Sequence, residues 1–428
     1  MGATGAVALP FCHKAPSLPL IMAQPGIPVE AEHASLGRSA MPELDTFRGV
    51  AAILMVINHA GFKLLEPDDA LSGLSGGFVF GGGFAPVLFF FATGFGAALG
   101  AGRRGGGTSA MWLSVATKAA LLLLADQFLF WRSGISWGLD FFGFIALCSV
   151  ASALVATRKR PLLWVAGLAV GVVALRYVLA PPFKAMLPSS GVVAWFVGIS
   201  AQPNISYPAA PWLAYPALGY CLGHLYQRWV IKADPAGDAW RRRVAFGLAA
   251  GVAVAGLAAA LDMQGVSFHR WGSVAAGFFV LSLAVLLVAT ALSLWLTKVF
   301  PRLAAAVALR GVASFAVVPV HYILLELCIA LGLGRIGAEH YFLLLAGLVP
   351  ASLWLAGRFD VGNAWLTQRV QGARPCMAAL VGLCVLTAVL MLDDAGPVTF
   401  AVAMAGQLLI AGLLAKARSQ SLAPTNLA

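Results

Sequence analysis

Apolar segments long enough to cross a bilayer follow one another along most of this 428-residue chain. About twenty apolar residues span the hydrocarbon core of a membrane as a helix. The segments that meet this length are 47–65, 78–101, 109–131, 137–157, 161–180, 211–230, 243–262, 272–297, 303–333, 339–357, 375–392 and 397–415. Because an open sheet edge leaves backbone groups unpaired in lipid, helices are the expected spanning elements. We predict an all-α, polytopic integral membrane helix bundle with about 12 transmembrane helices.

The composition agrees with a membrane protein. Hydrophobic residues make up 60% of the chain and charged residues 11%, whereas soluble domains carry roughly 25% charged residues. Residues 1–40 lack a charged segment followed by a clean apolar run, so we expect a flexible cytoplasmic tail there. The prediction is an integral membrane domain over 41–418 and a C-terminal tail over 419–428.

The net charge of +11 comes from Lys and Arg residues that gather in every second loop. Cytoplasmic loops are enriched in these residues, which places both termini in the cytoplasm. A basic domain that would hold nucleic acid is not evident, so no nucleic-acid partner is expected. The six cysteines form no CxxC pair, and we expect neither a zinc site nor another metal.

The stretch FRGVAAILMVINHAG (47–61) carries polar residues inside an apolar segment. Ionisable residues within a span are costly and mark functional sites. His59 follows Arg48 by eleven positions, so on one helix they lie about 16 Å apart along the axis and on the same side. Arginine suits phosphate recognition, and imidazole suits general base catalysis near neutral pH. The alternative is a membrane anchor at Arg48 and a hydrogen-bonded packing residue at His59.

Four further ionisable residues within apolar segments have open roles. His321 fits the positioning of an acceptor and plain core packing equally well. Asp140 is expected to cap a helix N-terminus, with a role in a substrate cavity as the alternative. Asp126 is expected to be structural. Arg310 fits phosphate binding and an ion pair with Asp45 equally well.

The stretch LDTFRGVAAILMVINHA (44–60) resembles the first-helix signature of the transmembrane acyltransferase superfamily. That superfamily includes the acyltransferase-3 family, the succinyltransferases of osmoregulated glucans and heparan-alpha-glucosaminide N-acetyltransferase. The shared residues are Leu44, Asp45, Arg48, Gly49, Asn58 and His59. DTFRG is particularly similar to the heparan branch, whereas the spacing from Arg to His is similar to the acyltransferase-3 branch.

Four later stretches resemble the superfamily in the matching order. They are APVLFFFATGFGAAL (85–99), followed by Arg103 and Arg104, then WGLDFFGFIALCSVASALVA (137–156), YPAAPWLAYPALGYCLGHL (207–225) and RGVASFAVVPVHYILLELC (310–328). The chain departs from the pattern at Phe315 and at Val318, where a tyrosine is usual. In the heparan branch the catalytic histidine lies further past the first helix, so His59 as base depends on the acyltransferase-3 likeness.

The resemblance implies that acetyl-CoA or another acyl-CoA binds from the cytoplasm and that its acyl group passes to a hydroxyl or amine of a glycan-type acceptor on the other side. The implied site residues are His59, Asn58 and His321 for catalysis; Arg48, Arg103, Arg104 and Arg310 for acyl-CoA; and Asp45, Asp140 and Trp212 for substrate or structural support.

The alternative function is a secondary transporter or flippase, because buried His and Arg residues and about twelve helices fit that class too. Inverted repeats with broken helices would favour a transporter, and no convincing repeat is evident in the sequence. A non-catalytic membrane scaffold is a third, weaker interpretation. The expected location is a bacterial inner membrane, with the lipid bilayer as partner and a homodimer compatible with the sequence.

Overall fold

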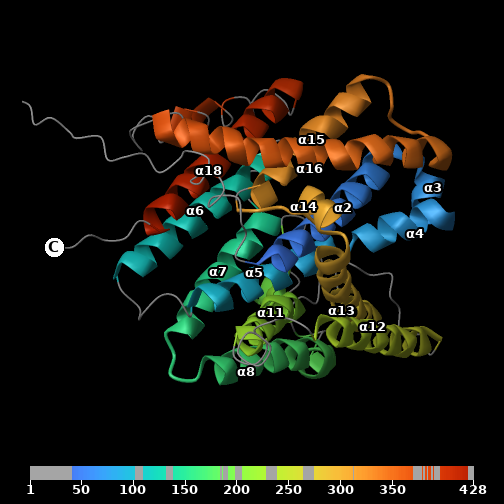
Figure 1. Cartoon of the computed structure of the whole chain (residues 1–428), viewed down its shortest axis with the longest axis vertical. Helices are drawn as coiled ribbons and strands as arrows, with labels where there is room; N and C mark the ends of the chain where they lie inside the picture. Colours follow the sequence, from blue (N-terminus) through green and yellow to red (C-terminus); the bar gives the residue numbers. More distant parts are fainter. Residues whose placement is uncertain are drawn as a thin grey trace, which may run out of the picture. The chain divides into compact units, whose positions relative to one another are not determined.

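The computed structural model describes most of the chain beyond residue 40. The described residues are 41–101, 109–131, 138–183, 186, 191–197, 205–227, 239–263, 274–311, 313–369, 378, 381–382, 384–386, 389 and 396–422. The regular elements within these ranges are helices (Figure 1). The predicted tail over 1–40 lies outside the described residues.

The helices follow the predicted apolar segments closely. They are α2 (Pro42–Leu64), α3 (Pro67–Leu71), α4 (Gly73–Gly82), α5 (Ala85–Ala101), α6 (Ser109–Trp131), α7 (Phe141–Ala156), α8 (Pro161–Ala174), η1 (Leu175–Leu179), η2 (Pro181–Phe183), α9 (Gly191–Val197), α10 (Ala209–Trp212), α11 (Ala214–Leu225), α12 (Trp240–Met263), α13 (Ala276–Val299), α14 (Pro301–Val307), α15 (Ala313–Ala330), α16 (Ala338–Arg369) and α18 (Pro397–Leu422).

Nine helices in the described part of the chain are long and apolar enough to cross a membrane. They cover Pro42–Leu64, Gly73–Gly100, Met111–Trp131, Pro161–Leu179, Trp240–Leu261, Ala276–Val299, Ala313–Ala330, Ala338–Phe359 and Pro397–Leu414. The prediction of an all-α, multi-pass membrane protein is confirmed. The total of about 12 and the cytoplasmic location of both termini stay predictions, and segment 375–392 falls largely outside the described residues.

One predicted segment is wrong in its extent. Residues 303–333 form two helices, α14 and α15, rather than a single span. The chain turns between them, and Gly311 there has a φ of 52°. Glycine adopts this left-handed conformation without the steric penalty that a Cβ brings, so it allows the break. The break lets residues 307–310 cross the start of α2.

Helix α2 is central to the arrangement because it contacts α4, α5, α13, α15 and α16 (Figure 1). Pro42 at its first turn lacks the N–H that a helix start leaves unpaired. Glu43 and Asp45 in the first turn and Lys63 in the last turn complement the helix dipole. Its buried face includes Phe47 and Val56. The helix is thereby held along its whole length, which fixes the side chains that it carries.

Glycines bring α5 and α11 into close contact. A Cβ on Gly219 would lie 2.0 Å from the Phe91 carbonyl oxygen, and a Cβ on Gly94 would lie 1.9 Å from that of Pro216. A Cβ on Gly223 would lie 2.8 Å from the Phe95 carbonyl oxygen. Small residues four apart commonly let membrane helices approach in this way. The Gly-x-x-x-Gly spacing on α11 therefore serves backbone contact.

Replacing Gly219 with leucine is expected to destabilise the protein, because the added side chain meets the backbone of α5 and not a flexible neighbour. Overpacking of this kind costs about 1–3 kcal/mol or more. Thermal unfolding of the purified protein in detergent measures the change. Gly167→Leu is the matched control, since a Cβ on Gly167 of α8 has nothing within 4 Å. Equal melting temperatures for the two variants would contradict the contact.

The start of α7 is capped by a carboxylate from α6. Asp126, which is fully buried, accepts hydrogen bonds from the backbone N–H groups of Asp140 (2.7 Å), Phe142 (2.9 Å) and Gly143 (2.6 Å). Asp140 does occupy the N-cap position, but its side chain makes no capping hydrogen bond. The predicted cap by Asp140 is thus wrong in mechanism, because Asp126 already satisfies the free N–H groups of the first turn. The structural role predicted for Asp126 is confirmed.

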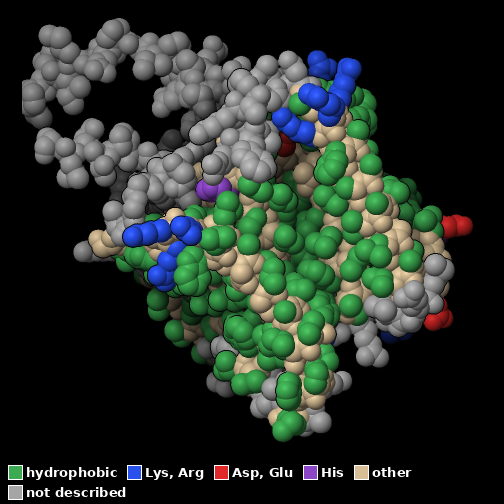
Figure 2. All heavy atoms as spheres, turned by 90° about the horizontal axis from the view of Figure 1, so that it is seen from below, with side chains coloured by type: hydrophobic (Ala, Val, Ile, Leu, Met, Phe, Trp, Pro, Cys, Tyr) green, Lys and Arg blue, Asp and Glu red, His purple; other side chains and the backbone are tan. Residues whose placement is uncertain are grey.

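One face of the molecule is covered mainly by hydrophobic side chains, and the Lys and Arg side chains visible on it gather near its margins (Figure 2). Helices α8 and α12 expose large apolar residues, among them Trp164, Val170, Phe246 and Val252. Exposed apolar surface on this scale is unfavourable in water and expected against lipid. The surface therefore agrees with a helix bundle embedded in a bilayer.

Candidate active site

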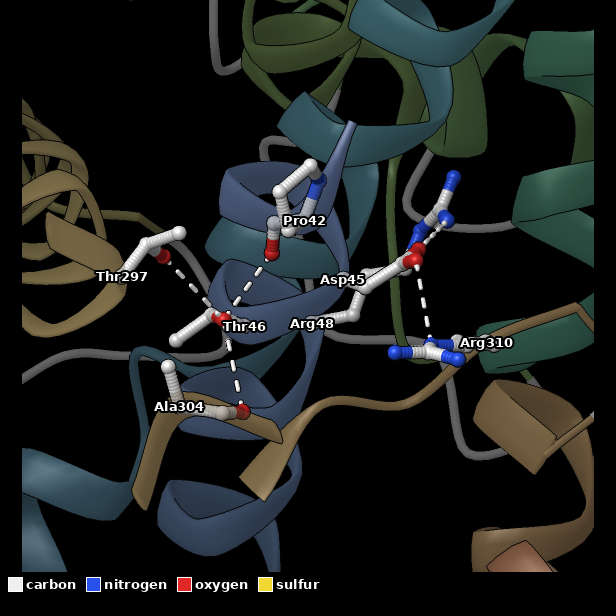
Figure 3. Close-up of polar contacts among 7 residues, drawn as sticks. All are labelled: Pro42, Asp45, Thr46, Arg48, Thr297, Ala304 and Arg310. Atoms are coloured by element: carbon white, nitrogen blue, oxygen red, sulfur yellow. Dashed lines mark hydrogen bonds and ion pairs between the residues drawn. The ribbon is translucent and has the colours of Figure 1, made fainter. Parts of the chain in front are cut away.

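Two arginines flank one buried carboxylate at the start of α2. Arg48 Nη1 donates to Asp45 Oδ1 over 3.0 Å, and Arg310 Nε lies 4.0 Å from Asp45 Oδ2 (Figure 3). We call Asp45, Arg48 and Arg310 the arginine cluster. The Asp45 side chain is 10% exposed, whereas those of Arg48 and Arg310 are 24% and 43% exposed. The cluster keeps one net positive charge and offers guanidinium groups to an anion.

Contacts on both sides of Asp45 bring Arg310 to α2. The backbone N–H of Leu309 donates to the Asp45 carbonyl oxygen over 3.0 Å. The Thr46 hydroxyl lies 2.9 Å from the Pro42 carbonyl oxygen and 3.5 Å from that of Ala304 (Figure 3). Residues 304–310 are thus tied to the first turn of α2.

The close packing around Gly49 explains why a glycine follows Arg48 in the motif. A Cβ at this position would lie 2.0 Å from the Val307 carbonyl oxygen. Any larger residue would push the segment that carries Arg310 away from α2. On the α5 side, a Cβ on Gly96 would lie 3.2 Å from Arg48 Nη2, so the guanidinium group rests against α5. Arg103 and Arg104, which were predicted to join this site, lie outside the described residues.

A pair of histidines forms the second part of the site. His59 Nδ1 lies 2.8 Å from His321 Nε2, and His321 Nδ1 lies 2.8 Å from the Val317 carbonyl oxygen. The Tyr322 ring stacks on His59 with a centroid separation of 5.1 Å. We call His59, His321 and Tyr322 the histidine cluster. His321 is fully buried and His59 half-buried, so the pair lies between α2 and α15.

The hydrogen bonds of the histidine cluster set its proton positions. The Val317 carbonyl oxygen can only accept, so His321 carries its proton on Nδ1. In a neutral ring the other nitrogen, Nε2, then accepts, and His59 Nδ1 must be the donor to it. Neutral His59 therefore has its basic lone pair on Nε2. The hydrogen bond to His321, whose own tautomer is set by Val317, holds His59 in this tautomer.

One turn further along α2, Lys63 forms an ion pair with Glu326 of α15. The Lys63 ammonium also lies 6.0 Å from the Tyr322 ring centroid, within reach of a cation–π contact. Sequence reasoning missed Lys63 and Tyr322 as neighbours of the histidines. The available signal was their spacing, because Lys63 stands four residues after His59 and Tyr322 directly after His321.

Asn58 and Trp212 are placed by packing contacts. Asn58 Nδ2 donates to the Val79 carbonyl oxygen of α4 over 2.8 Å, so its amide ties α2 to α4. Trp212 is fully buried and meets the rings of Phe90 and Tyr207 edge-on, at centroid separations of 5.8 and 4.9 Å. Asn58 thus supports the helix that carries His59, whereas Trp212 packs among aromatic rings of α5 and the segment before α10.

The arginine and histidine clusters lie about 16 Å apart along α2, because eleven residues at 1.5 Å each separate Arg48 from His59. Ala52 and Met55 lie on the same side of the helix between them. Both are buried, with exposures of 0% and 6%. In this conformation, packed side chains fill that path along α2. Among the residues described, no group of three or more His, Cys, Asp or Glu is placed to hold a metal ion.

Comparison with known families gives one match. The family model described as heparan-alpha-glucosaminide N-acetyltransferase, catalytic, matches residues 41–253. The matched region includes Asp45, Arg48 and His59, and it ends before α15, which contributes His321. Neither a curated protein nor a solved structure matches the chain. Through residues 41–253, the chain belongs to a heparan-alpha-glucosaminide N-acetyltransferase-like family of transmembrane acyltransferases.

Proposed function

We propose that the protein is an acetyltransferase that moves an acetyl group from cytoplasmic acetyl-CoA to a hydroxyl or amine of a glycan-type acceptor across a bacterial inner membrane. The observation that carries this proposal is the single helix α2, which holds an arginine cluster at one end and a hydrogen-bonded histidine pair further along. The family supplies the reaction class. The residues supply a place for the donor's phosphates and a base for the acceptor.

The arginine cluster suits the phosphates of coenzyme A. Guanidinium groups bind phosphate through paired, charge-assisted hydrogen bonds. Asp45 holds Arg48 through a 3.0 Å contact, so the guanidinium is oriented before the donor arrives. Arg103 and Arg104 follow α5, against which Arg48 rests, and we propose that they extend the same anion site.

The Arg48→Ala variant is expected to bind acetyl-CoA at least tenfold more weakly than the wild type. A charge-assisted hydrogen bond contributes about 1.5–3 kcal/mol, and about 1.4 kcal/mol corresponds to a tenfold change in Kd. Calorimetric titration of the purified protein in detergent measures this. Arg302→Ala removes an exposed arginine from nearby α14 and is the control, with an expected change of less than about threefold because exposed charges are screened. Equal losses in both variants would assign the effect to general electrostatics and reject the site.

The histidine cluster suits general base catalysis. His59 Nε2 takes the proton from the acceptor's hydroxyl or amine, and the freed lone pair attacks the thioester carbonyl carbon. The carbon–sulfur bond then breaks, the acetyl group stays on the acceptor, and the His59 imidazolium returns the proton to the leaving thiolate of coenzyme A. The Nδ1 proton of His59 stays on its hydrogen bond to His321 throughout. His321 thus acts as a positioning residue that keeps His59 in the reactive tautomer.

Donor binding requires movement between the clusters. Ala52 and Met55 are buried on the face of α2 that joins Arg48 to His59. The thioester arm of acetyl-CoA, anchored by its phosphates at the arginine cluster, reaches His59 only when these side chains separate from their neighbours. We propose that binding of the donor opens this path.

A further inference from the structure

A second place for a ligand lies between α6 and α7. It is a cavity of about 260 Å³. Its walls are mainly aliphatic and aromatic side chains, and the lining residues include Ala119 and Leu123 of α6 and Phe144, Leu147 and Val150 of α7. Trp195 of α9 covers part of it. The cavity is thus bounded mainly by apolar side chains, and at Leu123 its lining reaches the exposed side of the bundle.

The positions of the lining residues show that the cavity is elongated along α6 and α7. Gly143, Leu147 and Val150 follow one another at helical spacing, so they share one side of α7 and extend about 10 Å along its axis. Ala119 and Leu123, four residues apart, form the facing side on α6. We call this space the α6–α7 groove. Its form suits a chain that lies parallel to the helices.

Polar groups mark one end of the groove. Asp140 at the start of α7 and Tyr207 both line it there. Trp195 Nε1 donates to the Tyr207 carbonyl oxygen over 3.1 Å, which fixes this end of the lining. Burial raises the pKa of the Tyr207 phenol well above its usual value, and the nearby Asp140 and Tyr322 raise it further. The phenol therefore stays protonated and remains a hydrogen-bond donor.

The start of α7, at the polar end of the groove, packs against α15, because the Phe142 ring stacks on Phe315 at a centroid separation of 4.3 Å. Tyr322 of α15 lies near enough to Tyr207 to raise the pKa of its phenol, and the Tyr322 ring stacks on His59 at 5.1 Å. Tyr322 is thus near both Tyr207 and His59, which brings the polar end of the groove into the neighbourhood of the proposed base. A sugar inside the groove itself would leave hydroxyl groups without partners against the aliphatic walls, which is unfavourable. An aliphatic chain has no such groups.

We propose that the α6–α7 groove binds the aliphatic chain of an amphiphilic acceptor and presents its polar head, at Asp140 and Tyr207, to His59. The inference rests on the proposed acyl transfer for the role of the head group, whereas binding of the chain stands on the groove alone. It makes the acceptor a membrane-anchored molecule, such as a lipid-linked sugar, and not a free glycan. An acceptor of this kind would enter from the bilayer beside α6 and α7.

The test is photolabelling with an alkyl glucoside that carries a diazirine on its chain, applied to the full-length protein in detergent without acetyl-CoA. We expect saturable labelling of peptides from 119–123 and 139–150, removed by excess unmodified alkyl glucoside. Leu123→Trp fills the groove and is expected to lower the labelling about tenfold, because a well-packed site does not accommodate added volume. Leu154→Trp is the matched control, because Leu154 is as exposed as Leu123 (45% and 40% of the residue) but lies outside the groove. We expect Leu154→Trp to leave the labelling unchanged.

Leu147→Trp serves as a second filling variant, and both filling variants are checked by size-exclusion chromatography. Labelling that excess alkyl glucoside does not remove, or that falls equally in Leu123→Trp and Leu154→Trp, would show a general lipid-facing surface and overturn the groove. Acetyl-CoA titration of the same samples separates the two proposals. A wild type that is labelled but binds no acetyl-CoA would reject the proposed function and keep the groove.

Discussion

Replacing His59 with alanine is expected to lower the rate of acetyl transfer by about a hundredfold to ten-thousandfold, the usual contribution of a general base. The His59 side chain is half-buried, and its hydrogen bond goes to His321 on α15 and not to the backbone of α2. We therefore expect α2 to stay folded in the variant. Acetyl-CoA affinity should stay the same, because the arginine cluster lies about 16 Å away along α2. Single-turnover transfer from labelled acetyl-CoA, measured beside the binding titration, separates the two effects.

His321→Gln is the informative companion to His59→Ala. Glutamine keeps an oxygen that accepts from His59 Nδ1. It has no ring that joins this hydrogen bond to the one with the Val317 carbonyl oxygen, so it does not reproduce the effect of His321 on the basicity of His59. We expect a smaller loss of kcat than in His59→Ala, and a shift in the pH at which kcat/KM is half its maximum. A purely structural role for His321 would lower stability and leave this pH midpoint in place. A fully active His59→Ala protein would reject His59 as the base.

Replacing Asp126 with alanine is expected to destabilise the protein by about 3 kcal/mol or more, because each buried N–H group that loses its acceptor costs about 1–3 kcal/mol. The variant leaves three backbone N–H groups of the first turn of α7 without their acceptor inside the bundle. Unfolding by denaturant or heat in detergent measures the loss. Because the same turn carries Asp140, acceptor binding should fall together with stability.

Asp140→Ala is the matched control for Asp126→Ala. The two carboxylates are neighbours at the same helix start, but the side chain of Asp140 makes no capping hydrogen bond. We therefore expect a clearly smaller loss of stability in Asp140→Ala. If Asp140→Ala destabilised the protein as much as Asp126→Ala, the assignment of the cap to Asp126 would be wrong.

The sequence predicted the class of protein and the position of most helices, because bilayer thickness imposes a length and an apolar composition that any spanning helix must meet. It missed the break between α14 and α15. A continuous apolar run gives no sign that Gly311 adopts a left-handed conformation and that the preceding residues turn across α2. Hydropathy measures preference for lipid and carries little information about where a helix stops.

For the candidate site, the sequence identified single residues better than their partners. Helical spacing placed Arg48 and His59 on one side of α2, and the ion pair of Arg310 with Asp45 was one of two predicted roles. The contact of His59 with His321 joins residues 262 positions apart, and no periodicity within one helix reports which other helix it faces. The same reason explains why the pairing of Lys63 with Glu326 was not predicted.

The capping of α7 shows a different limit. Aspartate at a helix start is a strong N-cap signal, and Asp140 stands at that position. The neighbouring helix instead supplies Asp126, whose two oxygens accept three N–H groups. Asp140 itself lines the α6–α7 groove, where the alternative prediction of a substrate-cavity role for it can be tested.

Acetyl transfer across the membrane can be measured in a reconstituted system with acetyl-CoA on one side and the acceptor on the other. Proteoliposomes holding amino sugars and alkyl glucosides inside receive acetyl-CoA outside, with separate isotopes on the acetyl group and on coenzyme A. Only molecules whose arginine cluster faces the bath meet the donor. We expect the acetyl isotope to appear on an enclosed acceptor while the coenzyme A isotope stays outside. Entry of both isotopes without acetylated acceptor would contradict acetyl transfer and indicate a transporter.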